Sequence, residues 1–395
     1  MTIAAEFPFI RVTIDTRGLQ PAATRAFGNV AVVGSTGGFG TAVPDTPIQI
    51  GSEAEARAQF ADVDGSGAIA NDGADAGPLY HAVRTVLLQD PAPSRVFAVA
   101  TDDSDGSPGY TAALASLAAT PVQFVALAGE TDPAALAALK NHVETVSADG
   151  DRRIGVAMVD PDLAVAEGST FAQAAEAAYS GVKSDVSRMV LAAARVPVTG
   201  GVPAADVAAA VMGAMAGYPP HISVLMKQIR GVSVPLARQF SGSEIKQLAE
   251  QFMLPLIDPE LVPGEGIFMG SGRCYTTDTS RLYVDVIRVL DDIEFRLKAG
   301  LIGTIGNVQI DRLGMQALRS RIDAILGPLA TARVIAGYST EIPLLPVLEL
   351  EESLRSPGAV ATLTAARTSR IVEVLLSVTY AGSVHFLDVN LALRA

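Results

Sequence analysis

The strongest constraint in this sequence is a regular alternation of helical and extended apolar patterns between Pro78 and Ala193. Helices are predicted over residues 79–88, 110–118, 133–146 and 171–179, and strands over 95–100, 122–127, 154–159 and 188–192. Strands separated by helices of this length are typical of right-handed βαβ units. The sequence therefore predicts an α/β fold with a mostly parallel sheet that helices cover.

The flanking regions extend this pattern and suggest where the chain divides. Asn29–Val33 reads as a buried strand, and Ser52 with Glu55 forms a capping box that opens a helix to about Phe60. After Pro197 a small-residue helix lies between Gly and Pro residues, which indicates a domain junction or an edge crossover. It is followed by helices at 243–252, 280–299 and 308–326. We therefore expect an N-terminal arm (1–25), an α/β domain (26–200), a junction (201–240), a second, α/β or α+β domain (241–370) and a C-terminal strand arm (371–395).

Both ends of the chain carry a strand pattern of period two. One face is formed at the N-terminus by Ile10, Val12 and Ile14, and at the C-terminus by Leu387, Val389, Leu391 and Leu393. Chain ends usually fray, and unprotected edge strands invite another chain to pair. Two such ends predict strand donation between copies, which builds an open polymer where the arrangement does not close. The alternative is that both strands pair within their own subunit.

Charge and composition exclude several classes of protein. The 395 residues carry a net charge of −13 and no basic tract, which argues against a nucleic-acid partner. The longest nearly unbroken apolar stretch, Val207–Tyr218, is shorter than the roughly 20 residues of a membrane-spanning helix, so no membrane insertion is expected. No secretory signal pattern opens the sequence. The only cysteine is Cys274, and the four histidines are dispersed, so we expect no disulfide framework and no structural zinc or His-rich metal site.

A glycine-rich turn supports one alternative function. Gly34–Gly40 follows a predicted strand with the spacing of a dinucleotide-binding turn, and a nucleotide-binding α/β enzyme could use it. That chemistry requires a helix N-terminus directed at the phosphates. Here Pro44 and Pro47 forbid an immediate helix, so a surface loop is the favoured interpretation.

Other candidate sites are weaker. Asp62–Gly67 copies the start of a calcium loop, but the position of the bidentate glutamate is Gly73, which favours a simple turn. Cys274 has no partner histidine nearby in sequence, so a structural thiol is expected. Asp291 and Asp292 are consecutive on a helix and do not converge, so a solvated face is expected. We expect no enzyme activity, no catalytic residues, no metal and no cofactor.

One segment resembles a known family. Gly270–Asp278 followed by Tyr283–Arg288 is similar to the strand–turn and helix start of the contractile tail sheath proteins of bacteriophages and R-type pyocins, and Gly300 matches the small residue that ends that helix. The opening residues 10–50 also resemble the family's arm, strand and Gly/Pro turn. The chain lacks the tryptophans that members often carry, and Cys274 and Tyr275 replace the expected Thr-Leu pair.

The resemblance implies a structural role. Such a subunit would form hexameric rings stacked as a helical sheath around an inner tail tube protein, with baseplate and tail terminator proteins at its ends, and would contract to drive the tube through a cell envelope. It would assemble in the host bacterial cytoplasm and belong to the virion tail, or to the tail of a genome-free injection particle. By analogy, the C-terminal sheath domain would contact the tube, with Arg312, Arg319 and Arg321 as candidates.

Overall fold

The structure is a computed structural model that describes residues 28–69, 75–104, 108–199, 202–259, 266–383 and 385. These residues form two compact units. The larger contains the described residues from 26 to 292 and from 380 onward, and the smaller contains residues 293–379. The chain passes from the larger unit to the smaller one within helix α8 (Val284–Leu301).

A nine-stranded sheet organises the larger unit, in the order β2-β3-β1-β4-β5-β6-β10-β11-β9. Strands β3, β1, β4, β5, β6 and β10 are parallel, whereas β2, β11 and β9 pair antiparallel to their neighbours. The bounds are β1 (Asn29–Gly34), β2 (Ile48–Ile50), β3 (Arg95–Ala100), β4 (Phe124–Leu127), β5 (Ile154–Met158), β6 (Met189–Ala193), β9 (Gln228–Ile229), β10 (Leu254–Ile257) and β11 (Ile267–Met269). A short hairpin, β7 (Val198–Thr199) and β8 (Val202–Pro203), stands apart from this sheet.

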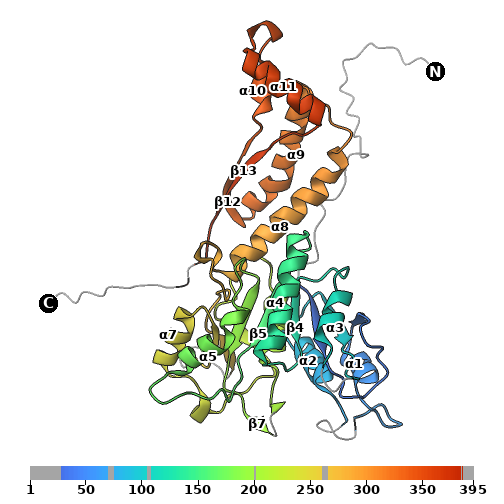
Figure 1. Ribbon diagram of the computed structural model, residues 1–395, viewed down its shortest axis with the longest axis vertical. Helices are drawn as coiled ribbons and strands as arrows, with labels where there is room; N and C mark the ends of the chain where they lie inside the picture. The colour runs from blue at the N-terminus through green and yellow to red at the C-terminus, as the bar shows by residue number, and fades with distance from the viewer. Residues whose placement is uncertain are drawn as a thin grey trace, which may run out of the picture. The chain divides into compact units, whose positions relative to one another are not determined.

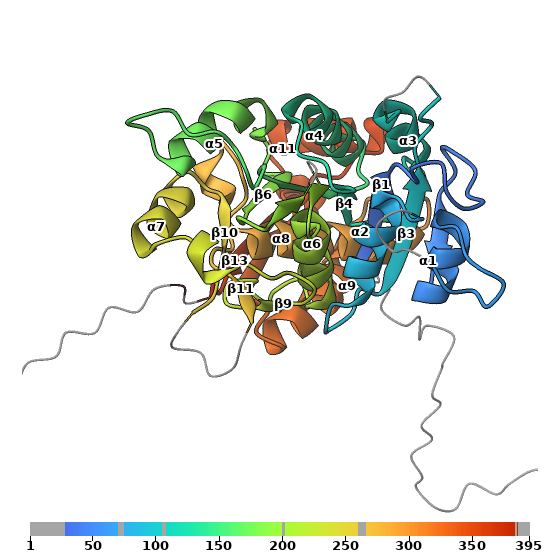
Figure 2. The same cartoon turned by 90° about the horizontal axis from the view of Figure 1, so that it is seen from below.

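Helices cover both faces of the sheet (Figure 2). Along β1, Val30 and Val32 join a core with α1, α2 and α6, whereas Ala31 and Val33 join a second core with α3, α4 and α5. The bounds are α1 (Glu53–Phe60), α2 (Pro78–Leu87), α3 (Tyr110–Ser116), α4 (Pro133–Ala148), α5 (Phe171–Tyr179), α6 (Val207–Gly217) and α7 (Gly242–Glu250). Every residue of β1, β4, β5 and β6 is buried, as expected for parallel strands covered on both sides. The predicted mostly parallel, helix-covered sheet is confirmed.

The division of the chain differs from the predicted one. Residues 201–240 are not a junction, because helix α6 is buried along its length against the sheet. The strands that follow, β9, β10 and β11, extend that same sheet. The boundary near residue 292 therefore lies about 50 residues beyond the predicted junction, inside a single helix. The small residues with their flanking Gly and Pro had suggested a domain junction or an edge crossover, and in the structure they allow close packing of helix on sheet.

The smaller unit is built from helices beside a two-stranded sheet (Figure 1). Its elements after α8 are α9 (Arg312–Thr331), β12 (Ile335–Glu341), α10 (Leu344–Glu349), α11 (Pro357–Ser369) and β13 (Leu375–Tyr380). Its core centres on Met315, Ile342, Leu345 and Leu363. Strand β13 pairs with β12, and Val372 and Val374 pack on the core. Residues 371–380, predicted as part of a C-terminal arm, therefore belong to the folded part of the chain.

Two helix starts also differ from their predictions. Helix α9 begins at Arg312 rather than near 308, because Asp311 caps it by accepting a hydrogen bond from the Gly314 amide at 2.7 Å. Helix α8 begins at Val284 rather than at 280, after a 3-10 turn over Thr279–Arg281. No helix in the described part of the chain is long and apolar enough to span a bilayer.

Candidate functional site

The glycine-rich turn after β1 does not build a phosphate site. Helix α2, whose N-terminus meets this turn, begins with Pro78, which has no N–H, and the Leu79 amide already donates to the Ser35 carbonyl at 2.9 Å. The backbones of Gly77 and Thr36 approach closely, since a Cβ placed on Gly77 would lie only 2.1 Å from the Thr36 carbonyl oxygen. The turn is packed against a helix end that has no amide left to offer an anion.

Carboxylates of the chain itself occupy two other helix N-termini at this edge, those of α4 and α6. Asp132 caps α4 through the Ala135 amide at 3.1 Å, and Asp206 caps α6 through the Ala209 amide at 2.8 Å. Asp206 also accepts from the Gly129 amide at 2.8 Å, directly after β4, and burial raises its pKa. These amides are the groups that bind phosphates in dinucleotide-binding folds. This arrangement disfavours the nucleotide-binding alternative.

The calcium-like segment forms a turn. Oδ1 of Asp64 accepts hydrogen bonds from the Ser66 amide at 2.8 Å and from the Ala68 amide at 3.0 Å, while Asp62 accepts from the Gly40 amide at 3.1 Å. Both carboxylates thus support loop structure, as the simple-turn interpretation predicted. Across the part of the chain that the structure describes, no cluster of three or more His, Cys, Asp or Glu side chains could hold a metal ion.

The family-like segment after β11 ties the start of α8 to the sheet. Cys274 donates its amide to the Leu282 carbonyl at 2.7 Å, and Tyr275 donates its amide to the Met189 carbonyl of β6 at 2.8 Å. The Tyr275 hydroxyl donates to Glu176 of α5 at 2.8 Å. Cys274 is fully buried, and burial raises the pKa of its thiol to about 12. The segment therefore has a structural role, because its hydrogen bonds connect the start of α8 to β6 and α5. The buried Cys274 is a structural thiol, as expected.

The two aspartates of α8 are buried, contrary to the expected solvated face. Asp291 is 9% exposed, Asp292 8% and Arg288 6%. Arg188, beside β6, donates two hydrogen bonds to Asp291, at 2.6 and 2.8 Å. Arg288 donates to the Tyr218 carbonyl at 2.6 Å, and burial lowers the pKa of its guanidinium to about 10. The correction has a simple physical cause for Asp291, because its charge is buried together with that of Arg188.

The three candidate tube-facing arginines of helix α9 do not all lie on the same side of the helix. All three are exposed. Arg312 and Arg319 are two helical turns apart on one side, whereas Arg321 lies about 200° around the axis from Arg319. Arg321 also donates Nε–H to the Gly300 carbonyl at the end of α8, at 2.7 Å. The structure thus brings Arg312 and Arg319 onto one surface and gives Arg321 a contact within the smaller unit.

The small sheet presents edges for strand addition. Among the described residues, β12 and β13 pair only with each other, so each strand has a second edge without a strand partner. Along β13, exposed and half-buried residues alternate from Leu375 to Tyr380. The predicted arm residues Ile10, Val12, Ile14, Leu387, Val389, Leu391 and Leu393 lie outside the described residues.

Sequence reasoning missed how the chain is held just before its C-terminal strand pattern. The Tyr380 hydroxyl donates to Asp285 of α8 at 2.5 Å. His385 forms a 2.8 Å hydrogen bond through Nε2 with the Ser223 hydroxyl. Its ring packs edge-on against the Tyr283 ring, with 4.7 Å between the ring centroids. These partners are 95 to 162 residues apart in sequence, so no local pattern could reveal them. They fix the chain to the larger unit immediately before residues 386–395.

Known structures share this fold over nearly the whole chain. The contracted helical sheath of the anti-feeding prophage aligns with a TM-score of 0.65 at 13% identity, covering 99% of both chains. The contracted PVC sheath complex, from an extracellular contractile injection system, aligns with a TM-score of 0.64 at 13% identity, covering 99% of this chain and 98% of that one. A sheath tail protein from Desulfitobacterium hafniense aligns with a TM-score of 0.58 at 13% identity, covering 84% and 93%.

These alignments confirm the resemblance that the sequence suggested, at the level of the fold. No family model and no curated protein matches the sequence. The chain has the fold of contractile sheath proteins in both of its units, because the alignments extend from one end of the chain to the other.

Proposed function

We propose that the chain is a structural subunit of a contractile sheath. The observation that carries this proposal is the shared fold along 99% of the chain with two helical sheaths in the contracted state. The subunits would stack as hexameric rings around an inner tube, between baseplate and terminator proteins. They would form part of a phage tail or of an injection particle, assembled in the bacterial cytoplasm.

The small sheet and the two strand-patterned ends support assembly by strand exchange. Strands β12 and β13 each offer an edge, and backbone hydrogen bonds at such an edge can bind an extended segment of another chain. The N-terminal residues 10–14 and the C-terminal residues 387–393 of adjacent copies are the proposed donors. Tyr380 and His385 hold the chain on the larger unit, so the C-terminal donor would begin at residue 386.

During contraction, neighbouring subunits must stay connected while the packing between their folded bodies changes. Strands shared between subunits would keep the lattice linked, and the rigid sheet-and-helix bodies would exchange neighbours between two packed arrangements. The larger unit suits this role, because its cores bury both faces of a nine-stranded sheet. Arg312 and Arg319 are the proposed contacts with an acidic tube.

Truncation of the C-terminus tests the proposal. We expect the full chain to form hollow striated cylinders in negative-stain electron microscopy, and a chain lacking Leu387–Ala395 to remain a folded monomer. The matched control replaces Asp388 and Asn390, on the other face of the same strand pattern, with alanine and keeps the cylinders. Cylinders of normal length from the truncated chain would refute the strand-exchange role. The absence of cylinders from the full chain, alone and with its tube protein, would refute the sheath role.

A further inference from the structure

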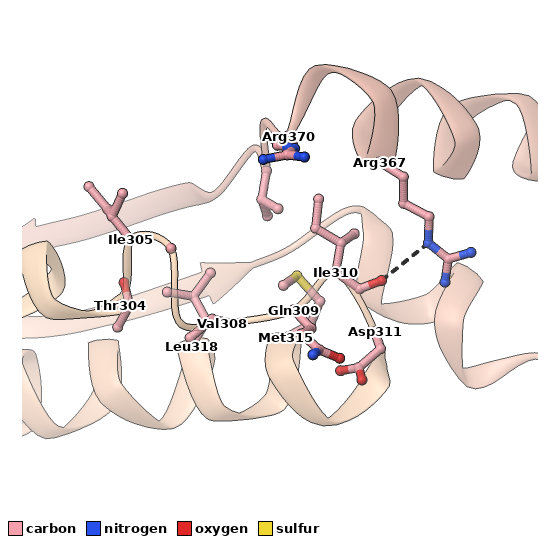
Figure 3. Close-up of a pocket in the computed structure, with 12 residues that line it drawn as sticks. Thr304, Ile305, Val308, Gln309, Ile310, Asp311, Met315, Leu318, Arg367 and Arg370 are labelled. Atoms are coloured by element: carbon pink, nitrogen blue, oxygen red, sulfur yellow. Dashed lines mark hydrogen bonds between the residues drawn. The ribbon is translucent and has the colours of Figure 1, made fainter.

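The smaller unit contains a pocket of about 840 Å³ beside the start of α9 (Figure 3). The loop between α8 and α9, the first turns of α9 and the end of α11 surround it. Its apolar floor is formed by Val308, Ile310, Met315, Leu318 and Val372. Met315 belongs to the core of the unit, and the other four are half-buried residues packed on that core. The volume is within the range of small-ligand and side-chain pockets.

Apolar side chains around this pocket remain exposed to solvent. Ile305, which lines it, is 74% exposed. Ile371, which lies in sequence between the lining residues Arg370 and Val372, is 69% exposed. Large apolar side chains gathered around a hollow mark a surface that binds an apolar partner.

The charged rim of the pocket is mainly cationic. Arg367 and Arg370 line it at the end of α11, and both are exposed. Arg367 donates Nε–H to the Ile310 carbonyl at 3.3 Å, as Figure 3 shows, which leaves its terminal nitrogens available on the rim. The carboxylate that lines the pocket, Asp311, is engaged in capping α9 through Gly314. An occupant that combines apolar side chains with an acidic group would complement this pocket.

We propose that the pocket binds residues 2–9 of a neighbouring copy of this chain, with Phe7 and Phe9 on the apolar floor and Glu6 beside Arg367 and Arg370. This segment, Thr-Ile-Ala-Ala-Glu-Phe-Pro-Phe, carries one acid and two phenylalanines separated by a proline. It lies outside the described residues. It precedes the strand pattern of residues 10–14 and would anchor the tip of that arm.

The proposal rests on the proposed function, because sheath assembly is what would bring neighbouring copies together. Proline preorganises the two flanking phenylalanines by limiting backbone freedom, which lowers the entropy lost on binding. The other terminal segment, residues 386–395, has a single phenylalanine, and its one acid, Asp388, is balanced by Arg394. Its charge and aromatic content fit the pocket less well.

Disulfide cross-linking within assembled protein tests this occupant directly. The only natural cysteine, Cys274, is buried and its thiol has a pKa of about 12, so introduced cysteines are the reactive ones. The test variant carries Phe7→Cys and Gln309→Cys, because Gln309 lines the pocket and is exposed. Non-reducing gel electrophoresis after mild oxidation should show a ladder of covalently linked subunits.

A matched control uses Phe7→Cys with Ser353→Cys. Ser353 is exposed in the same unit, beyond the other end of α11, about 20 Å from the pocket by the rise of that helix. A disulfide requires Cα atoms within about 7 Å, so the pocket pair should cross-link at least about tenfold faster than the control pair. Equal rates for the two pairs would overturn the proposal. Preferential cross-linking of Gln309→Cys with Leu391→Cys would also overturn it, by placing the C-terminal segment in the pocket.

Charge exchange provides an independent measurement. Replacing Arg367 and Arg370 with glutamate should slow cross-linking at low salt by roughly tenfold, and Glu6→Lys in the same chain should restore most of the rate. A lack of rescue would contradict the placement of Glu6. Far-UV circular dichroism establishes that each variant is folded.

Electron microscopy of the same samples separates this proposal from the function on which it rests. Cylinders that form without preferential cross-linking would refute the pocket proposal and leave the sheath role intact. Cross-linked ladders without cylinders would support the pocket proposal and contradict the sheath role.

Discussion

The guanidinium of Arg188 and the carboxylate of Asp291 form a two-point ion pair, with N–O distances of 2.6 and 2.8 Å, inside the larger unit. The two side chains are only 7% and 12% exposed. The pair joins the entry to β6 to helix α8, 103 residues later in the chain. It therefore fixes the position of the helix that leads into the smaller unit.

Removing one partner of this pair should be costly. Asp291→Ala leaves the Arg188 charge buried and unpaired, and we expect the free energy of unfolding to fall by about 3–5 kcal/mol. Urea denaturation followed by circular dichroism measures the change. Glu250→Ala, which removes an exposed pair with Lys246 at 3.9 Å, is the control and should cost less than about 1 kcal/mol. Similar losses in both variants would contradict a structural role for the buried pair.

Stability should also fall as the pH is lowered through the titration of His142. Arg153 donates to Nε2 of His142 at 3.0 Å, and burial together with this cation lowers the pKa of His142 to about 4. The unfolded chain takes up this proton near pH 6.5, whereas the folded chain takes it up only near pH 4. More protons are then bound in the unfolded state, so stability decreases as the pH falls between these values.

The variant His142→Gln isolates this effect. Glutamine can still accept the hydrogen bond from Arg153 but does not titrate. We expect the urea midpoint of the variant to change less between pH 6.5 and pH 4 than that of the natural chain. An identical pH profile for the two proteins would show that His142 does not contribute.

Nucleotides should not change the melting temperature of the protein. The Leu79 amide of α2 already donates to the Ser35 carbonyl, and Asp132 and Asp206 already accept from amides at the starts of α4 and α6. Thermal unfolding in millimolar NAD(P) or ATP should therefore match unfolding in buffer alone. A saturable rise in melting temperature would revive the nucleotide-binding alternative, because a ligand that binds only the folded state stabilises it.

The sequence allowed the parallel core to be predicted because β1, β4, β5 and β6 are continuous apolar runs, and burial on both faces requires such runs. The sequence pattern predicted burial wrongly where burial of a residue depends on a partner far away in the chain. Asp291 and Asp292 look like a solvated face, yet Arg188 makes burial of Asp291 possible. In the same helix Leu290 is 45% exposed, whereas the charged residues Asp291 and Asp292 occupy part of the buried face.

The sequence failed to predict contacts at the candidate sites for the same reason, namely that they depend on residues far apart in the chain. The small-residue helix α6 suggests a domain junction until the sheet against which it packs is known. The contacts of Tyr380 with Asp285 and of His385 with Ser223 join residues that no periodic pattern connects. Local capping signals were more informative, since Ser52 caps α1 by accepting from the Glu55 amide, although the Glu55 side chain accepts from the Gly51 amide rather than completing the predicted capping box.

The surface of α9 gives the sharpest test of tube attachment. Arg312 and Arg319 share one side of the helix, whereas Arg321 is bonded to the Gly300 carbonyl. We expect Arg312→Glu with Arg319→Glu to reduce co-sedimentation with an acidic tube about tenfold at low salt, with the difference shrinking as salt screens the charges. Arg321→Glu should instead lower the stability of the smaller unit and leave tube binding nearly unchanged. If Arg321→Glu weakened tube binding as much as the double variant, the tube would not distinguish the two sides of α9, and the proposed contact surface would be wrong.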